Sequence, residues 1–333
     1  MRASRNDTNM IHRILLVAGL AGALAAQSPP CISLNDANNN VGTAISAFGF
    51  AGPNVNAYQF TPTSSLVLYA AQVYTASTAF SSPRGYQTLE VWDTNFIFLP
   101  QSRLGGGTWQ NQPTNPLTPS WQGASFDAPV VLTANQTYWL VWRDSGGNLL
   151  PYEPGGTPAV WARLSGATWT QQATSQAIKW RGFCSLLDGQ GVTPVGLGCL
   201  ATNGKTPVAF TNNAPTVGNG LFQFEGSGFA AGALGLAILG VNPGWVPLPI
   251  PGAPAGCSLY VDPLLVATVP IGTGNEQAVH TTGCAGHCWF DLGIPANPAL
   301  VGFVIDAQFA GFDAASAAAL PFVFSNGVRV TLF

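Results

Sequence analysis

The chain has 333 residues, of which 47% are hydrophobic and only 8% are charged. A charged fraction so far below the usual quarter, together with 39 glycines and 26 prolines, indicates a turn-rich chain with a surface of neutral polar groups. The formal net charge of −3 and the lack of a basic patch argue against nucleic acid and anionic membrane surfaces as partners.

Residues 1–26 are typical of a secretory signal peptide. Arg2, Arg5 and Arg13 precede an apolar run at residues 14–24, and small residues suited to cleavage lie at 23–25. We therefore expect an exported protein, secreted or held at the cell surface. Removing these residues, with their three arginines and one aspartate, leaves a net charge of −5. No later stretch reaches the roughly 18 apolar residues of a spanning helix, so no transmembrane segment is predicted.

Residues 27–187 are predicted to form a first all-β domain. Short apolar runs alternate with clusters of Gly, Pro, Asn and Ser, a pattern that indicates an antiparallel, jelly-roll-like β-sandwich. The predicted strands are 57–60, 66–74, 88–92, 129–132, 138–143, 159–164 and 177–183.

Residues 129–144, PVVLTANQTYWLVWRD, are the most informative stretch of this domain, because they indicate two strands joined by a polar turn at 133–136. In the second strand, Tyr138, Leu140 and Trp142 face one side of the sheet, and Trp139, Val141 and Arg143 face the other. Both sides are largely apolar, which suits either a covered central strand or an aromatic binding platform. Residues 126–140 resemble, at the level of fold, a hairpin of secreted bacterial sandwich modules.

A glycine-rich linker at 188–198 leads to a second predicted β-sandwich, residues 199–333. Its predicted strands are 208–211, 221–225, 233–239, 258–261, 267–269, 288–292, 301–308, 322–325 and 328–333.

Several segments of this second half carry a family resemblance. They are GLGC at 196–199, LAILG at 236–240 before Trp245, PAGCSLY at 254–260, IPANPALVG at 294–302, Gln308, and Ser325 with Asn326. The half thereby resembles a C-terminal β-domain carried by exported proteins of environmental bacteria, which has no established activity. The resemblance implies a Cys199–Cys257 disulfide, with Cys284 and Cys288 as an addition peculiar to this chain.

Six cysteines in an oxidising compartment favour disulfides. Cys31 and Cys184 bracket the first domain, and we expect them to pair. Cys284 and Cys288 are expected to close a small disulfide loop. The alternative is a zinc site, because two thiolates and two imidazoles, from His280, Cys284, His287 and Cys288, would complete a tetrahedron.

Eight of the ten tryptophans lie in the first domain, and aromatic rings pack well against the apolar faces of sugars. Trp92, Trp142, Trp161 and Trp180 fit strand patterns and are expected in the core. Loops rich in Gly, Pro and Gln are expected to expose the candidate contacts Trp109, Asn111, Gln112, Trp121, Trp169, Gln171 and Gln172.

The sequence therefore favours an exported, non-catalytic binding or adhesion protein whose partner is a polysaccharide or a cell-surface or matrix component. The competing hypothesis is a structural component of the cell envelope or matrix, with every tryptophan in the core. A third is a divergent polymer hydrolase, which is disfavoured because the chain has no Ser nucleophile elbow, HExxH or paired-acid motif. No cofactor is expected, although loop aspartates and carbonyls are compatible with calcium.

Overall fold

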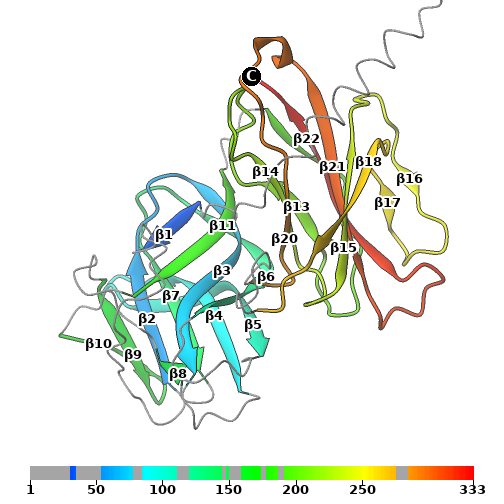
Figure 1. The fold of residues 1–333 in the computed structure, drawn as a ribbon. Coiled ribbons are helices and arrows are strands. Elements are labelled where there is room, and N and C mark those ends of the chain that lie inside the picture. Colours follow the sequence, from blue (N-terminus) through cyan, green and yellow to red (C-terminus); the bar gives the residue numbers. More distant parts are fainter. Residues whose placement is uncertain are drawn as a thin grey trace, which may run out of the picture.

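A computed structural model describes residues 31–34, 54–77, 85–110, 120–144, 148–149, 159–173, 178–186, 191–274 and 284–333 of the chain. Across these ranges the regular structure is β-strand, apart from one 3-10 turn, η1 (Pro298–Leu300). The strands form two sandwiches that lie side by side, one from each half of the chain (Figure 1). The predicted all-β fold is confirmed. The predicted signal peptide lies outside the described ranges.

The first sandwich has two six-stranded sheets. Their orders are β1-β11-β3-β6-β19, with β8 paired to β3, and β10-β9-β2-β7-β4-β5. The strands from the first half are β1 (Ile32–Leu34), β2 (Asn54–Phe60), β3 (Leu66–Ser77), β4 (Tyr86–Thr94), β5 (Pro100–Gln110), β6 (Ser120–Leu132), β7 (Tyr138–Asp144), β8 (Asn148–Leu149), β9 (Trp161–Ser165), β10 (Thr168–Gln171) and β11 (Trp180–Leu186).

The second sandwich packs a five-stranded sheet, β12-β22-β21-β15-β18, against a three-stranded one, β13-β14-β20, and a two-stranded flap, β16-β17, accompanies them. Where the sequence suggested a linker, four residues form the edge strand β12. The strands from the second half of the chain, including β19 of the first sandwich, are β12 (Val192–Val195), β13 (Val208–Thr211), β14 (Gln223–Ser227), β15 (Leu234–Gly240), β16 (Leu248–Pro249), β17 (Ser258–Leu259), β18 (Leu265–Pro270), β19 (Cys284–Ala285), β20 (Cys288–Asp291), β21 (Val304–Phe312) and β22 (Phe322–Thr331).

The core of the first sandwich follows the predicted alternation, since Tyr138, Leu140 and Trp142 all point into it. At one end β5 packs directly against β6 of the opposite sheet. This approach requires glycine, because a Cβ atom on Gly107 would overlap the backbone carbonyl of Ser125. Glycine at this position of β5 therefore permits the close approach of the two sheets.

The strands predicted at 129–132 and 138–143 do form, but they belong to different sheets. The turn between them is a corner of the sandwich and not the tip of a hairpin. Two backbone groups of the corner are held in place, since the Thr133 N–H donates to the Tyr138 hydroxyl at 2.9 Å and the Asn135 N–H donates to the Pro62 carbonyl at 2.8 Å. Asn135 adopts a left-handed conformation with φ of 61°, which its short polar side chain tolerates.

A strand of the second half completes a sheet of the first. β19 pairs in parallel with β6, where Cys284 lies opposite Gly123 and Ala285 opposite Ala124. The Gly123 N–H also donates to the carbonyl of Gly274, at 3.2 Å. Backbone groups at this edge of β6 are thereby satisfied by the other half of the chain.

Side chains reinforce this contact, which we call the join. The rings of Tyr69 and Phe210 stack at 4.0 Å, and the Ser227 hydroxyl donates to the Tyr69 carbonyl at 3.2 Å. Lys205 donates to the carbonyl of Ser125 at 2.8 Å. The join therefore combines a shared sheet, stacked rings and hydrogen bonds between the halves.

Two of the three predicted disulfides are confirmed. Cys31 bonds to Cys184, with Cα atoms 5.8 Å apart, and Cys199 bonds to Cys257, with Cα atoms 5.0 Å apart. We call the Cys199–Cys257 bond the second disulfide. Within the described residues no helix is long and apolar enough to cross a membrane.

The predicted Cys284–Cys288 disulfide is wrong, because both sulfurs are buried thiols that point into different hydrophobic clusters. Cys284 packs with Ala70 and Phe183 of the first half, whereas Cys288 lies in the core of the second sandwich. Burial, and then the charge of Glu225, raise the pKa of the Cys288 thiol. This thiol is therefore kept in its unreactive protonated form.

Truncating Phe210 to alanine should loosen the join. The ring is buried, so the free energy of unfolding should fall by about 3–5 kcal/mol. Because the ring contacts the other half, the single thermal transition expected of the intact chain should split into two, as measured by calorimetry and near-UV circular dichroism. Phe333→Ala, at an exposed terminal ring, is the control. An unchanged single transition in the Phe210 variant would contradict the stabilising role of the join.

Candidate functional site

The most informative surface is the side of the sheet β10-β9-β2-β7-β4-β5 that faces away from the first core, which we call the outer face. At its centre Ala57, Trp139, Val141 and Ala162 form a separate buried cluster. Trp139 is fully buried, and its indole N–H has no hydrogen-bond partner among the described residues. Such a donor normally requires an acceptor.

Two further tryptophans lie over this cluster. Trp92 of β4 and Trp169 of β10 are both half-buried, and their rings meet edge to face with centroids 6.0 Å apart and an interplanar angle of 77°. Three strands separate β10 from β4, which is about 19 Å at 4.8 Å per strand in a flat sheet. The sheet must therefore curl, and both indoles must lean over its small central residues. Two partly accessible aromatic rings therefore meet on the outer face.

Beside Trp92 the carboxylate of Glu90 is nearly buried, and three donors compensate it. Its Oε1 atom accepts from the Nε of Arg103 at 3.0 Å. Its Oε2 atom accepts from the Nε of Arg143 and from the indole N–H of Trp92, both at 2.9 Å. A buried carboxylate is tolerated only with such partners. Glu90 thus fixes the orientation of the Trp92 ring, over which the Arg143 guanidinium lies at 5.6 Å.

Arg103 also joins a second carboxylate, because its terminal nitrogen donates to Asp127 at 2.6 Å. Partial burial by itself would raise the pKa of Asp127. Hydrogen bonds from Arg103 and from the Gly106 N–H, together with the charge of Arg103, outweigh burial and hold that pKa below its ordinary value. A glycosidase needs one carboxyl group with a raised pKa to act as acid. Asp127 lacks that property, and an arginine bridges it to Glu90.

Neutral polar side chains border the outer face. The hydroxyls of Thr88 and Thr108 lie 3.0 Å apart on β4 and β5. At the opposite edge Gln171 is exposed and lies beside Ala162 in the strand register, so it shares the face with Trp169. The amide of the neighbouring Gln172 is instead turned back, because it donates to the carbonyl of Thr170 at 2.9 Å.

The prediction that Trp109 is an exposed loop residue is wrong. Trp109 lies on β5 and is only 2% exposed, inside the first core. Its indole N–H donates to the Gln122 side chain at 3.3 Å, and Gln122 in turn accepts from Gln87 at 3.2 Å. This polar chain continues to Trp142, whose indole N–H donates to Gln87 at 2.9 Å. Trp109 therefore closes the end of the core.

Trp121 is half-buried but belongs to a different surface. It lies on β6 and faces away from the core on the sheet that carries the join, where Tyr74 contacts it at 5.3 Å. The Arg181 guanidinium lies 4.3 Å from its ring centroid, which is cation–π geometry. Trp121 and Trp169 are thus on opposite sides of the sandwich and do not form one site. The candidate residues Asn111 and Gln112 lie outside the described ranges.

Sequence reasoning missed the role of Trp92, which was expected in the core. Glu90 and Trp92 are two residues apart on β4, so strand periodicity puts both side chains on one face of the sheet. The same periodicity puts Trp139 and Arg143 of β7 on one face. A charged residue on a largely apolar face was the available signal that the face meets solvent. Trp142, Trp161 and Trp180 are buried as predicted.

Three residues of the zinc alternative, Cys284, His287 and Cys288, are described, and among the described residues no three His, Cys, Asp or Glu side chains could hold a metal ion together. His287 is buried near the join, and its Nε2 lies 2.9 Å from a carboxylate oxygen of Glu225. Its ring packs 4.8 Å from that of Phe183. The two cysteines point into different cores, and His280 lies outside the described ranges.

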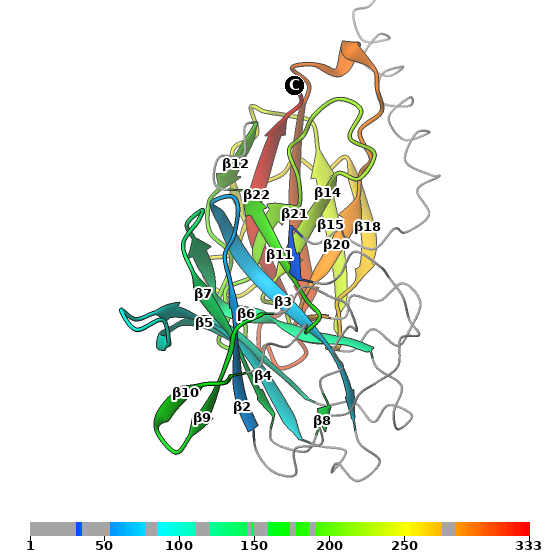
Figure 2. The same ribbon diagram turned by 90° about the vertical axis from the view of Figure 1, so that its left-hand side faces the viewer.

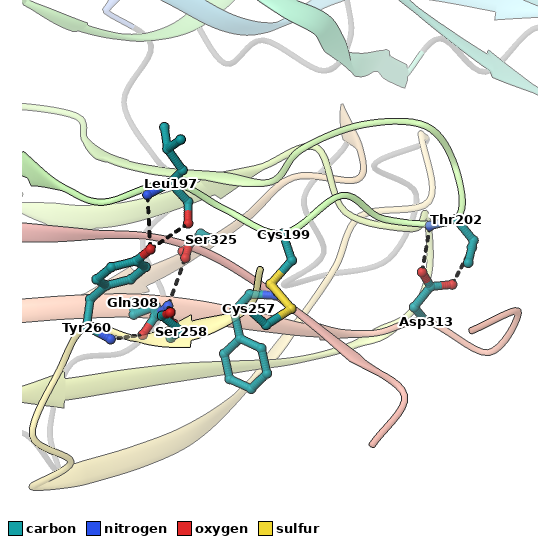
Figure 3. The surroundings of a disulfide bond; sticks show 10 residues. Leu197, Cys199, Thr202, Cys257, Ser258, Tyr260, Gln308, Asp313 and Ser325 are labelled. Atoms are coloured by element: carbon teal, nitrogen blue, oxygen red, sulfur yellow. Dashed lines mark hydrogen bonds between the residues drawn. A yellow bond between two sulfur atoms is a disulfide. The ribbon is translucent and has the colours of Figure 1, made fainter. Parts of the chain in front are cut away.

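Residues that carry the resemblance of the second half gather near the second disulfide (Figure 3). The Gln308 amide oxygen accepts from the Tyr260 N–H at 2.9 Å. The Gln308 amide nitrogen donates to the carbonyls of Ser258 and Ser325, at 2.9 and 2.8 Å. The Tyr260 hydroxyl exchanges hydrogen bonds with the backbone of Leu197. These polar groups are bound to the backbone, so they hold strands and loops together.

No protein-family model, no characterised protein and no solved structure matches the chain. The resemblance of the second half therefore stays a prediction, and function must be inferred from the residues of the outer face.

Replacing Asp127 with asparagine should change how stability depends on pH. Because the pKa of Asp127 is lower in the folded chain than the value of about 3.9 in an unfolded one, its stabilising contribution is complete above about pH 4. The contribution disappears as the pH falls through the folded value. Urea unfolding should find the original chain more stable than Asp127→Asn at pH 6, by less than about 1 kcal/mol because the carboxylate is half-exposed. A difference that does not shrink as the pH falls below about 4 would contradict this assignment.

Proposed function

We propose that the chain is an exported, non-catalytic binding protein that holds a polysaccharide on the outer face. The observation that carries this proposal is the convergence of Trp92 and Trp169, both partly accessible, on the outer face, which neutral polar groups border. Aromatic rings pack against the C–H faces of sugars, and hydroxyl and amide groups bind the sugar hydroxyls. Thr88, Thr108 and Gln171 supply such groups on both sides of the indole pair.

The charges of the face favour a neutral glycan. Arg103 and Arg143 both donate to Glu90, and Arg103 also donates to Asp127. A uronic acid or sulfate would have to compete with these carboxylates for the arginines. A neutral sugar instead needs only the rings and the polar border.

The competing hypothesis, a structural component of the envelope or matrix, has one observation in its favour. The join connects both halves through a shared sheet and stacked rings, which suits a rigid element. That hypothesis also expected every tryptophan in the core, however, and Trp92, Trp121 and Trp169 are all partly accessible. The hydrolase hypothesis is weaker, because the carboxylates nearest the indoles are held by arginines.

The proposal is tested by affinity gel electrophoresis of the mature full-length chain. The gels contain neutral polysaccharides (hydroxyethylcellulose, laminarin, xylan or galactomannan) or anionic ones (alginate or polygalacturonate). We expect retardation by at least one neutral polysaccharide. Trp92→Ala/Trp169→Ala should weaken it about tenfold or more, since covering the accessible parts of the two rings together contributes about 1.5 kcal/mol or more.

Trp245→Ala is the matched control, because it removes a half-buried indole from the second sandwich. Its retardation should equal that of the original chain, and circular dichroism should confirm that all variants fold. Retardation by none of the neutral polysaccharides would refute the proposal for those glycans. Retardation that the double variant keeps would move the site away from the outer face.

A further inference from the structure

We infer that the turn between β4 and β5 is an apolar anchor that inserts into the interfacial region of a lipid membrane with uncharged or zwitterionic headgroups. The anchor consists of Phe96, Ile97 and Phe98, which we call the apolar tip. This inference is independent of glycan binding, because it concerns other residues and another kind of ligand.

The apolar tip is unusually exposed. Phe96 is 93% exposed, Ile97 54% and Phe98 65%. Single exposed apolar residues are ordinary on protein surfaces, but contiguous ones mark interaction sites. A segment beside the β5 label projects outward on the left of Figure 2, and the tip lies in the turn that leads into β5.

Four hydrogen bonds within the turn hold its shape. The side-chain oxygen of Asn95 accepts from the N–H groups of Ile97 and Leu99, at 3.0 and 2.9 Å. The Asn95 N–H donates to the Leu99 carbonyl at 2.9 Å, and the Phe98 N–H donates to the Asn95 carbonyl at 3.0 Å. The groups paired in this way need no water, so these four bonds are kept when the turn enters an apolar medium.

Phe98 is also conformationally strained, because its φ of 60° lies in the left-handed region. That region is unfavourable for a bulky side chain, and glycine or asparagine would occupy it with less strain. Phe98 therefore combines backbone strain with an exposed apolar ring, and neither feature stabilises the fold. An outlier of this kind points to a function outside the fold.

The tip fits a fluid apolar phase better than a protein pocket. Consecutive residues of a tight turn point in different directions, so one pocket would cover only some of the three side chains, whereas hydrocarbon surrounds them all. From Asn95 or Leu99 to Ile97 is two residues, or about 7 Å at 3.3 Å per residue. This length matches the roughly 5–10 Å by which interfacial elements enter the boundary of headgroups and acyl chains.

The charge around the tip selects the kind of membrane. Arg103, the basic residue on this hairpin, is bound by Glu90 and Asp127. Asp93, beside the turn, accepts from the Ser102 N–H at 2.5 Å. The base of the tip thus offers no attraction for anionic lipids, which would also be repelled by the acidic chain. Phosphatidylcholine is the matching surface.

The test is sedimentation of the mature full-length chain with phosphatidylcholine vesicles, and with vesicles that contain about one-third phosphatidylglycerol. We expect weak, reversible binding to phosphatidylcholine that the anionic lipid does not strengthen. Phe96→Ser/Phe98→Asn should lower the partition coefficient about tenfold to a hundredfold. Asparagine suits the left-handed position, so this variant should keep the fold, which thermal unfolding would verify.

The control is Leu197→Ser/Leu200→Ser, which removes two side chains that are 78% and 65% exposed on the second half. It should bind vesicles like the original chain. No sedimentation of the original chain at millimolar lipid would overturn the inference, as would equal losses in both variants or binding that requires phosphatidylglycerol. Light scattering that finds a dimer in the original chain and a monomer in the tip variant would also overturn it, because a second copy would then be the occupant.

Discussion

The parallel pairing of β19 with β6 is the constraint on which the arrangement of the molecule depends. The first sandwich does not complete its own sheet, because two residues of the second half occupy the edge of β6. The stacked rings of Tyr69 and Phe210 then lie against the outward side of that sheet. One surface of the first sandwich is thereby in contact with the second half of the chain. The outer face, on the second sheet, and the apolar tip beside it are left for external partners.

The outer face resolves an ambiguity that the sequence leaves open. The two apolar sides of β7 are both covered, but in different ways: Leu140 belongs to the main core, whereas Trp139 lies under two other indoles. Trp92 and Trp169 therefore cover this small cluster with one side of their rings, and they leave part of each ring accessible to solvent. Glu90 and its arginines hold one of these rings in place. A prearranged aromatic surface loses little conformational freedom when a ligand binds.

Much of the fold could be predicted from strand alternation and from cysteine positions, but the candidate site could be predicted only in part. The strand at 208–211 and the Cys31–Cys184 disulfide follow from local pattern and chain order. β5 was missed because three consecutive glycines indicate a loop, although in this strand they permit close packing of two sheets. Trp109 lies on the same strand, so its predicted position in a loop was wrong for the same reason. Cys284 and Cys288 are close in sequence yet enter different cores, which only the tertiary arrangement decides. Trp169 was found because its setting rich in Gly and Gln indicated exposure, although it lies on the short edge strand β10 and not in a loop, whereas its partner Trp92 comes from a distant strand.

The claim that sugars bind over the indole pair is tested most directly by nuclear magnetic resonance of the mature chain labelled with ¹⁵N at its tryptophans. Cellohexaose, laminarihexaose and xylohexaose would be added in turn, and the indole N–H signals followed. The account predicts that one of these neutral oligosaccharides shifts the signals of Trp92 and Trp169, while Trp109 and Trp142, bound to Gln122 and Gln87 inside the core, stay unchanged. Shifts confined to Trp121, or no shift with any of the three, would contradict it.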